Sequence, residues 1–364
     1  MRVLFCGGGT AGHVYPNIAI AETLEKNINK VSFAYVVTEK GIENSIVDFK
    51  KYKISAQGFK KDKIFTKGIS FVKKTIQAIN ESKKIINEYD PDIIIGTGGF
   101  GAYPVIFAGK KMGVKTLLHE SNLVPGKAVK YLEKKVDKIL VNYEESIKYF
   151  REKEKVLRVG NPIRNAYKII NKSEAKKLLQ IDENKKVIVS FGGSLGARRI
   201  NDSMIEFVEN YLKYDKNTIL YFITGKKDYS RVKQILKNYS NKNIHLIDFA
   251  YNLPEIIASA DITISRAGAM TISELSLTKK CSILVPSPNV ANNHQYKNAK
   301  MISKSGAAIL LTEDKLYALT DIIKELLNDE QKRALMGEKI ELFSVKESNK
   351  IICFEILKLL KGNY

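Results

Sequence analysis

The first feature of the sequence that could carry chemistry is a run of glycines that ends in a histidine. Gly7-Gly8-Gly9-Thr10-Ala11-Gly12-His13 follows the apolar run 2–6 and matches the pattern GxGxxG. Glycines permit a tight turn whose backbone N–H groups approach phosphate oxygens at a helix N-terminus. An imidazole at such a turn can accept a hydroxyl proton at neutral pH. We therefore expect a phosphate-binding loop with His13 as a candidate general base; the alternative is a histidine that only caps the helix.

A second glycine cluster lies in the same half of the chain. Residues 96–102 read GTGGFGA and follow the apolar run 92–95. Two glycine loops in one half favour a large phosphorylated ligand, although a tight turn for close strand-to-helix packing would need the same residues. Asp90-Pro91-Asp92 has the letters of a DxD metal motif but precedes its strand. We expect no metal there.

The second half offers two further anion-binding segments. Residues 191–198 (FGGSLGAR) present backbone N–H groups, the hydroxyl of Ser194 and a cation, and residues 265–274 (SRAGAMTISE) read as a strand end, a turn and a helix start. The N-terminal end of a helix stabilises negative charge. Glu274, one turn into that helix, suits ribose hydroxyls, unless it is an ordinary glutamate near the helix start. The loop 292–295 (NNHQ) suits uncharged hydroxyls or is simply a polar surface loop.

These loops must be positioned by strands that alternate with helices. Short β-branched runs alternate with segments of helical period, which predicts parallel sheets built from βα units. The expected strands are 2–6, 31–37, 93–96, 114–118 and 139–141 in a first series, and 187–191, 219–223, 244–247, 262–264 and 282–285 in a second. Each half opens with a strand, a glycine-rich turn and a helix. We expect the α/β class with two Rossmann-like domains, whose parallel sheets leave a ligand-binding cleft between their carboxyl ends.

The two series of strands are separated by a segment that fits neither period. Gly160-Asn161-Pro162 interrupts the pattern, and the hinge is expected at 160–165. We expect an N-terminal domain at 1–162, a C-terminal domain at 163–345 and a last segment at 346–364. Residues 347–360 have an amphipathic pattern. Such a helix could pack back on the first domain or complete the second.

Composition limits the classes of protein to consider. The 364 residues include 60 Lys and Arg against 39 Asp and Glu, a net charge of +21, which favours an anionic partner. Hydrophobic residues at 44% and charged residues at 27% exclude collagen-like, disordered and disulfide-scaffold chains. Three cysteines without CxxC spacing indicate reduced thiols. We expect neither a signal peptide nor a membrane-spanning segment.

Two other functions use part of this pattern. An NAD-dependent Rossmann enzyme would explain the first glycine loop, with Glu39 as the acid after the second strand, but it leaves the anion-binding segments of the second half unused. A basic nucleic-acid-binding or scaffold protein would explain the charge, but it needs neither His13 nor paired glycine loops. Neither accounts for all of the motifs together.

The motifs together resemble one family over essentially the full length of the chain, the MurG family of peptidoglycan N-acetylglucosaminyltransferases. The motifs that carry the resemblance are GGGTAGHVYP at 7–16, GTGGFGAYP at 96–104, HESNLVPGKA at 119–128, VGNPIR at 159–164, FGGSLGARRIN at 191–201, SRAGAMTISEL at 265–275 and NNHQYKNA at 292–299. The resemblance implies an inverting GT-B enzyme that moves GlcNAc from UDP-GlcNAc to the C4 hydroxyl of MurNAc in undecaprenyl-pyrophosphoryl-MurNAc-pentapeptide, converting lipid I to lipid II. Another GT-B glycolipid synthase is the nearest alternative, because the fold does not fix the acceptor.

The resemblance also implies roles for individual residues. The residues implied in catalysis are His13 and Glu120. Those implied in binding the donor are Thr10, Ala11, Gly12, Asn122, Arg164, Ser194, Ala250, Arg266, Ala269, Met270, Thr271, Ile272, Ser273, Glu274 and Gln295. Those implied in binding the acceptor pyrophosphate are Gly12, His13, Gly98, Gly99, Phe100 and Gly101. The sequence departs from the family at Ala11, Ser121 and His294, where the family more often has glycine, glutamine and a glutamine-like residue, and this puts fine sugar contacts in doubt.

The expected partners follow from this reaction. They are UDP-GlcNAc as a substrate, a polyprenyl-pyrophosphate-linked MurNAc-peptide acceptor and an anionic membrane surface, with no nucleic acid, no cofactor and no required metal. Residues 60–84 are rich in lysine, with interleaved apolar residues, a combination that suits an anionic bilayer, although a helix whose apolar side faces the core would look similar. We expect a peripheral enzyme at the cytoplasmic face of the cell membrane, with roles in cell shape and division through peptidoglycan synthesis.

Overall fold

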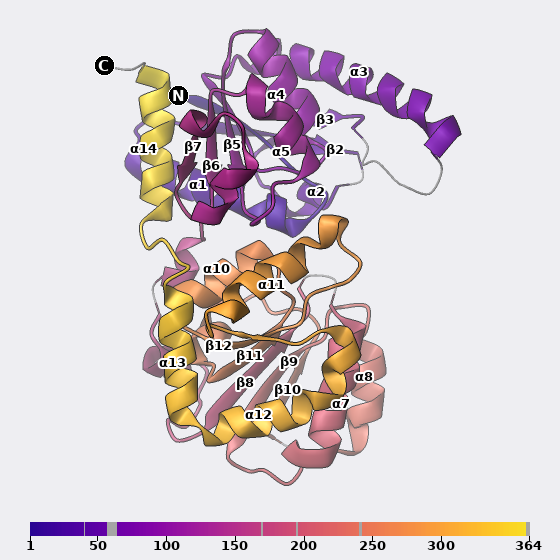
Figure 1. Ribbon diagram of the computed structural model, residues 1–364, viewed down its shortest axis with the longest axis vertical. Helices are drawn as coiled ribbons and strands as arrows, with labels where there is room; N and C mark the ends of the chain where they lie inside the picture. The colour runs from indigo at the N-terminus through magenta and orange to yellow at the C-terminus, as the bar shows by residue number, and fades with distance from the viewer. Residues whose placement is uncertain (40, 57–63, 169, 194–195, 240–241, 362–364) are drawn as a thin grey trace. The chain divides into compact units, whose positions relative to one another are not determined.

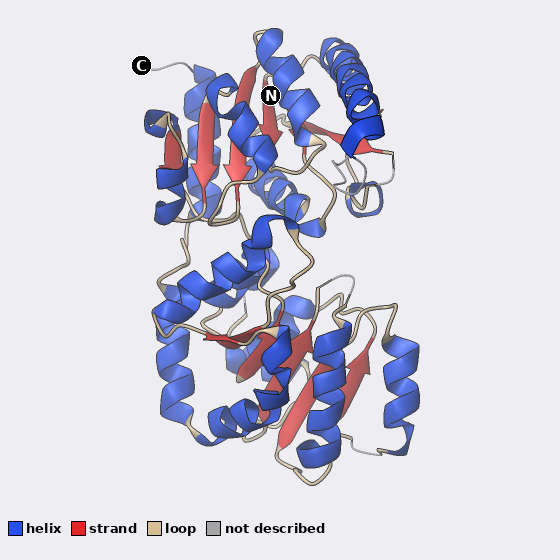
Figure 2. Ribbon diagram, turned by 45° about the vertical axis from the view of Figure 1, so that its right-hand side comes forward, coloured by secondary structure: helices blue, strands red, loops and turns tan. Residues whose placement is uncertain are grey.

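The computed structural model shows two compact units (Figures 1 and 2). Unit 1 comprises Met1–Arg164 and Val345–Tyr364, and unit 2 comprises Asn165–Ser344. The structure describes residues 1–39, 41–56, 64–168, 170–193, 196–239 and 242–361, and of residues 64–70 and 168 it describes the backbone only. The chain therefore passes from one unit to the other twice, after Arg164 and after Ser344.

Unit 1 is built on a seven-stranded sheet in the order β3-β2-β1-β4-β5-β6-β7. All of its neighbouring strands are parallel. The strands are β1 (Arg2–Cys6), β2 (Ser32–Thr38), β3 (Lys50–Ile54), β4 (Ile93–Gly96), β5 (Lys115–Glu120), β6 (Lys138–Val141) and β7 (Val156–Arg158). The order reverses at β1, so the loops after β1 and β4 meet where ligands of such sheets bind.

Helices cover both faces of this sheet. They are α1 (Tyr15–Asn27), α2 (Glu43–Ile46), α3 (Ile64–Tyr89), α4 (Ala102–Lys111), α5 (Lys127–Leu132) and α14 (Ser348–Lys361), with short 3-10 turns η1 (Ala11–His13), η2 (Glu133–Lys135), η3 (Glu144–Tyr149) and η4 (Lys153–Lys155). Successive strand residues point to opposite faces. Leu4 and Cys6 accordingly pack in one core with α3, α4 and α5, and Val3 and Phe5 pack in another with α1 and α14.

The last helix belongs to unit 1 and holds the segment that leads out of it. Asn349 accepts a hydrogen bond from Ile163 N at 3.0 Å and donates to Ile163 O at 2.9 Å and to Thr23 Oγ1 of α1 at 3.1 Å. Ser348 Oγ donates to Asn161 O at 2.8 Å. These hydrogen bonds join the segment 161–163 to the start of α14, and α14 to α1.

Unit 2 is built on a second parallel sheet, in the order β10-β9-β8-β11-β12-β13. Its strands are β8 (Lys186–Phe191), β9 (Thr218–Ile223), β10 (Ile244–Ile247), β11 (Ile262–Ser265), β12 (Cys281–Leu284) and β13 (Ile309–Leu310). Its α-helices are α6 (Lys172–Leu178), α7 (Arg198–Phe207), α8 (Tyr229–Ile235), α9 (Leu253–Ser259), α10 (Ala269–Leu277), α11 (His294–Lys304), α12 (Leu319–Asn328) and α13 (Glu330–Glu341). Its shorter turns are η5 (Asn165–Lys168), η6 (Val208–Leu212), a π-turn that continues α7, η7 (Leu236–Asn238), η8 (Ala291–Asn293) and η9 (Glu313–Ala318).

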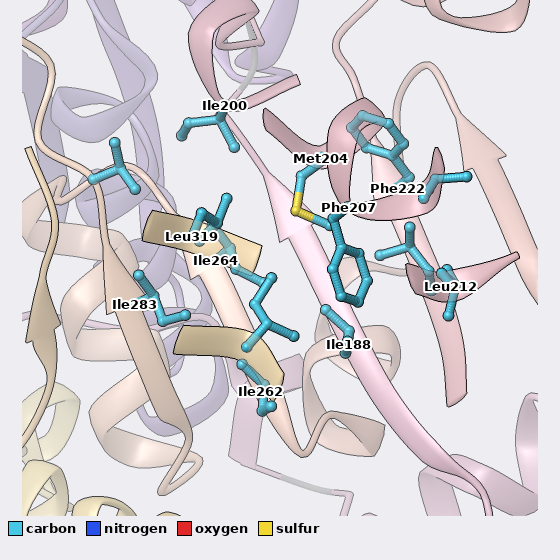
Figure 3. Close-up of a cluster of buried hydrophobic side chains, with 14 of the residues drawn as sticks. Ile188, Ile200, Met204, Phe207, Leu212, Phe222, Ile262, Ile264, Ile283 and Leu319 are labelled. Atoms are coloured by element: carbon cyan, nitrogen blue, oxygen red, sulfur yellow. The ribbon is translucent and has the colours of Figure 1, made fainter. Parts of the chain in front are cut away.

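The main core of unit 2 lies between its sheet and the helices α7 and α12. Figure 3 shows Ile188, Ile264 and Phe222 from three neighbouring strands meeting Phe207 of α7 and Leu319 of α12, and all five side chains are fully buried. Burying such a side chain stabilises the fold by about 1.5–3 kcal/mol. The two parallel sheets with their helices confirm the predicted α/β class.

The ten expected strands are all present, with ends that differ by one or two residues. The structure adds three strands that the sequence pattern did not predict, namely β3, β7 and β13. Each of them lies at the edge of its sheet.

Candidate active site

The two glycine loops of unit 1 are in contact at the carboxyl ends of β1 and β4. A Cβ atom at Gly99 would lie 2.2 Å from the carbonyl oxygen of Gly8, and one at Gly7 would lie 2.4 Å from Thr97 Oγ1. The φ angles of Gly7 and Gly99 are also positive, at 143° and 77°, and other residues rarely adopt such angles. Only glycine permits the two loops to approach each other this closely.

The ring of His13 is held between these loops in one tautomer. Its Nδ1 atom lies 2.8 Å from the carbonyl oxygen of Thr97. A carbonyl oxygen only accepts hydrogen bonds, so Nδ1 of the neutral ring carries the proton and Nε2 does not. An unprotonated Nε2 on a half-buried, fixed ring is what a general base requires.

A buried polar network that the sequence did not predict fixes the backbone at both ends of this loop. Asn17 Nδ2 donates to Cys6 O at 3.2 Å, to Tyr35 OH at 3.1 Å and to Thr97 Oγ1 at 3.1 Å. The hydroxyl of Tyr35 donates to Gly7 O at 2.7 Å, and that of Thr97 donates to His13 O. Its signal in the sequence was a polar residue, Asn17, among the mostly apolar residues that α1 buries.

The structure brings together the unit 1 residues that the resemblance assigned to the acceptor pyrophosphate. Gly12 and His13 lie in the turn η1 together with the predicted donor residue Ala11, and His13 N donates to the carbonyl oxygen of Thr10, another predicted donor residue, at 3.0 Å. From the second loop, Gly98 lies against the His13 ring, since a Cβ there would be 3.2 Å from Nδ1. The ring of Phe100 packs against the first loop at Gly9, and Gly101 is the N-cap residue of α4.

Glu120 is the last residue of β5, and its carboxylate organises the loop that follows. Oε1 accepts hydrogen bonds from the backbone N and side-chain Nδ2 of Asn122, at 2.9 and 3.0 Å. Oε2 accepts one from Gly126 N at 2.8 Å. The buried carboxylate therefore acts on the position of Asn122, which the resemblance assigns to the donor sugar.

Arg164, which the resemblance assigns to the nucleotide, is the last residue of the first stretch of unit 1. Its guanidinium lies 4.6 Å from the centre of the Tyr15 ring. Such a cation–π contact is worth about 0.5–1 kcal/mol at an exposed site and more when it is desolvated. The contact gives this cation a fixed position at the start of α1.

His119, next to Glu120, is a buried histidine that the sequence did not single out. Its Nε2 lies 2.9 Å from Gly160 O in the segment that leads out of unit 1. Burial lowers the pKa of His119 from 6.5 to about 4, against the smaller opposite effect of that hydrogen bond. The ring is therefore neutral in the folded chain at neutral pH.

This shift predicts that unit 1 loses stability in weak acid. The folded chain takes up the His119 proton only near pH 4, whereas the unfolded chain takes it up near pH 6.5. The free energy of unfolding should therefore fall as the pH drops from 6.5 to 4, by about 3 kcal/mol in total at 1.36 kcal/mol per pKa unit. Urea unfolding of the wild type, His119→Gln and the control His294→Gln across this range measures the effect. An equal slope in wild type and His119→Gln would contradict it.

In unit 2, the predicted donor residues follow the carboxyl ends of neighbouring parallel strands. Helix α10 begins at Ala269 after β11, so Met270 and Thr271 lie in its first turn, followed by Ile272 and Ser273. Glu274 comes one turn later and is half-buried. The N-terminal end of this nine-residue helix carries the positive end of the helix dipole.

The glycine loop after β8 lies against the loop after β9. A Cβ atom at Gly196 would be 2.2 Å from the carbonyl oxygen of Thr224. Ser194 of the same loop lies outside the described residues.

Arg266, another predicted donor residue, has a carboxylate partner within unit 2. Its guanidinium forms an ion pair with Glu313, with Nη2 and Oε1 2.6 Å apart, and also donates to Val285 O at 3.3 Å. A diphosphate at this place would meet a cation whose charge is already balanced by a carboxylate. The positive end of the α10 dipole should therefore contribute more than Arg266 to the binding of an anion by unit 2.

The other two donor residues lie in the loops after β10 and β12. Ala250 is half-buried beside the aromatic pair Phe249 and Tyr251, whose ring centres are 5.0 Å apart. Gln295, near the start of α11, accepts a hydrogen bond from Ser287 N at 2.8 Å through Oε1. Oε1 therefore holds the 286–288 turn, and the –NH₂ group of Gln295 is the end that can donate to a sugar hydroxyl.

Comparison with known proteins decides the family. Residues 3–141 match the glycosyltransferase family 28 N-terminal domain, and residues 187–352 match the C-terminal domain of the same family. A relative from Thermoanaerobacter sp. is 39% identical over 100% of both chains. One from Bacillus cytotoxicus is 38% identical over 99% of both. Both are named UDP-N-acetylglucosamine--N-acetylmuramyl-(pentapeptide) pyrophosphoryl-undecaprenol N-acetylglucosamine transferase. The chain belongs to the MurG family of glycosyltransferases.

Solved structures agree with this at the level of the fold. The crystal structure of Acinetobacter baumannii MurG superposes with a TM-score of 0.76 at 21% identity, covering 98% of this chain and 99% of that one. A UDP-GlcNAc 2-epimerase from Neisseria meningitidis, solved with UDP-GlcNAc, superposes with a TM-score of 0.67 at 16% identity, covering 98% and 100%. Membership of the MurG family confirms the predicted GT-B glycosyltransferase and makes the NAD-dependent alternative wrong.

Proposed function

We propose that this chain transfers GlcNAc from UDP-GlcNAc to the C4 hydroxyl of MurNAc in lipid I, forming lipid II in peptidoglycan synthesis. The names of its full-length relatives describe this reaction. The structural observation that carries the proposal is the His13 ring, whose Nδ1 is occupied by Thr97 O at 2.8 Å, which leaves Nε2 as a base between two glycine loops.

Unit 1 has the acceptor role in this proposal. The backbone of residues 12–13 and 98–101 holds the acceptor pyrophosphate, because glycine loops let phosphate oxygens approach the backbone. His13 Nε2 removes the proton of the C4 hydroxyl while that oxygen attacks the anomeric carbon of GlcNAc. The bond from that carbon to UDP breaks as the new bond forms on the opposite side, so the configuration inverts and UDP leaves.

Unit 2 has the donor role. The start of α10 and the loop after β8 bind the diphosphate, with Ser194 as one of the assigned residues, Glu274 accepts from ribose hydroxyls, and Ala250 presents its backbone to uracil. Gln295 and, from unit 1, Asn122 bind the GlcNAc. Residues 10–12 and Arg164 also bind the donor. Preorganised N–H groups and a helix dipole stabilise the charge that develops on the leaving diphosphate. We propose that this suffices without a cofactor or a required metal ion.

We further propose that α3 contacts an anionic membrane surface at the cytoplasmic face of the cell. Val72 and Ile76 are 55% and 54% exposed, one helical turn apart, and Lys73, Lys83 and Lys84 are exposed on the same helix. Lysines among exposed apolar residues bind anionic lipid through both charge and burial. Residues 60–63 of the predicted basic stretch lie outside the described residues. No helix in the described part of the chain is long and apolar enough to cross a bilayer.

The membrane proposal predicts a loss of vesicle binding when the exposed apolar pair is removed. Val72→Ser/Ile76→Ser should sediment with phosphatidylglycerol vesicles about tenfold less than the wild type at low salt, because two exposed apolar side chains of α3 are gone. Leu342→Ser in unit 2, at a side chain 77% exposed, is the matched control and should bind normally. Equal binding of the wild type to phosphatidylglycerol and phosphatidylcholine vesicles would refute the proposal.

The transfer itself is tested with two acceptors. Radiolabel from UDP-GlcNAc should appear in a lipid I analogue and not in diacylglycerol, which a glycolipid synthase of the same fold would use. Labelled diacylglycerol, or no labelled product with either acceptor, would contradict the proposed function.

A further inference from the structure

A buried carboxylate under the first glycine loop has no role in the assignments above. Glu43 is the first residue of the short helix α2, and none of its surface is exposed. A carboxylate is costly to bury unless hydrogen-bond donors surround it. The groups that bind Glu43 therefore show what this carboxylate organises.

The two carboxylate oxygens of Glu43 bind two different segments. Oε1 accepts hydrogen bonds from Thr38 N at 3.0 Å and from Thr38 Oγ1 at 2.6 Å, at the end of β2. Oε2 accepts a hydrogen bond from Gly9 N at 3.3 Å, in the glycine loop after β1. Glu43 thus links the end of β2 to the middle of the first glycine loop.

The backbone is packed tightly around this carboxylate. A Cβ atom at Gly8 would lie 2.5 Å from Glu43 Oε1, and one at Gly41 would lie 1.9 Å from it. The carboxylate therefore fills the space that side chains at these two positions would occupy. The glycines at 8 and 41 are needed because the acid lies between them.

The second glycine loop packs against Thr38, the residue that Glu43 binds at the end of β2. A Cβ atom at Gly101 would lie 3.1 Å from Cγ2 of Thr38, the residue that Glu43 holds. The ring of Phe100 packs on Gly9, whose Cβ position is 2.9 Å from the ring. Both loops around His13 are therefore supported by Glu43, directly or through Thr38.

We propose that Glu43 is a positioning residue for the transfer reaction. It fixes the conformation of the two glycine loops that hold the acceptor pyrophosphate and orient His13, without touching substrate itself. The proposal rests on the proposed function, because that function assigns the acceptor to these loops. It predicts an effect on the acceptor and none on the binding of UDP, which is assigned to unit 2 and Arg164.

The test compares Glu43→Gln with Glu43→Asp and a matched control, Glu39→Gln, at a nearby exposed acid. In Glu43→Gln, the amide can accept through one oxygen only, so an –NH₂ group faces either Gly9 N or Thr38 N. A misplacement of this kind should raise KM for lipid I and lower kcat by about tenfold each, with binding of UDP alone unchanged. Glu43→Asp, which keeps both acceptor oxygens, should recover part of the loss.

A purely structural role gives a different pattern. It would lower the fraction of folded enzyme, and hence kcat, without changing KM for lipid I, and Tm would fall in step. Acceptor kinetics of Glu43→Gln equal to those of Glu39→Gln, or loss of folding in both Glu43 variants, would overturn the proposal.

A second readout separates this proposal from the proposed function. The chain has four histidines, so the ring nitrogen signals of His13 can be assigned by one substitution and followed by NMR. Glu43→Gln should shift the His13 signals and leave those of His245 unchanged, whatever reaction the enzyme catalyses. Unchanged His13 signals would overturn the positioning role even if the wild type makes lipid II. Absence of transfer by the wild type would overturn the proposed function alone.

Discussion

His13→Ala is expected to lower kcat for GlcNAc transfer by about 10²-fold or more, the usual contribution of a general base. Binding of UDP should remain unchanged, because its uracil, ribose and diphosphate are assigned to residues of unit 2 and to Arg164, and not to His13. The reason for the large effect is geometric. Thr97 O holds Nδ1 at 2.8 Å, so the ring presents Nε2 without any reorganisation, and alanine removes both the base and this fixed orientation. Single-turnover kinetics and calorimetric titration with UDP measure the two quantities.

The matched control for this variant is His245→Ala. His245 is an exposed histidine on the edge strand β10, stacked on Tyr221 with ring centres 4.6 Å apart, and its loss should leave kcat within about twofold of the wild type, as for most surface substitutions. Turnover by His13→Ala close to that of His245→Ala would remove His13 from the role of base. A parallel loss of UDP binding would show that the substitution acts on more than unit 1.

Glu120→Gln is expected to lower kcat/KM for UDP-GlcNAc by about 10²-fold, since small displacements of positioned groups have effects of this size. Glu120 accepts three hydrogen bonds, two from Asn122 on Oε1 and one from Gly126 on Oε2. A glutamine keeps only one accepting oxygen, so either Asn122 or Gly126 loses its partner and meets an –NH₂ group instead. Asn122, the assigned reader of the GlcNAc, would then no longer be held in place.

Two titrations distinguish this effect from a general loss of structure. Glu120→Gln should bind UDP as the wild type does and UDP-GlcNAc more weakly, because only the sugar is read by Asn122. Glu144→Gln, at an exposed acid of η3, should change the affinity for neither UDP nor UDP-GlcNAc. If Glu120→Gln bound UDP-GlcNAc normally and turned over normally, the positions of Glu120 and Asn122 would not matter for the reaction.

The sequence predicted the central strands because burial on both faces leaves an unbroken apolar run. Strand β4, for example, consists of Ile93–Gly96 and is buried throughout. The edge strand β3 has the sequence KKYKI, and only its last residue is buried. A strand that pairs on one side and faces solvent needs no apolar run, so its residues resemble those of a loop. The two other unpredicted strands, β7 and β13, have three and two residues, too few to show a period.

The site was predictable where a residue type is forced by local backbone geometry. Glycine is the only residue that fits at 7 and 99, and such positions form recognisable loops after apolar runs. The residues that hold these loops were not predictable in the same way. Asn17 acts on Tyr35 and Thr97, and Glu43 acts on Gly9, and these partners are brought close by the parallel pairing of β1 with β2 and β4. The Glu313 partner of Arg266 lies beyond two further strands of the chain.

The most direct test of this account is a crystal structure with UDP-GlcNAc bound. In that crystal structure we expect the ribose hydroxyls within hydrogen-bond distance of Glu274, the diphosphate at the start of α10, and the uracil against the backbone of Ala250. A uridine bound instead at residues 7–12 of unit 1, away from Glu274, would contradict the assignment of the donor to unit 2.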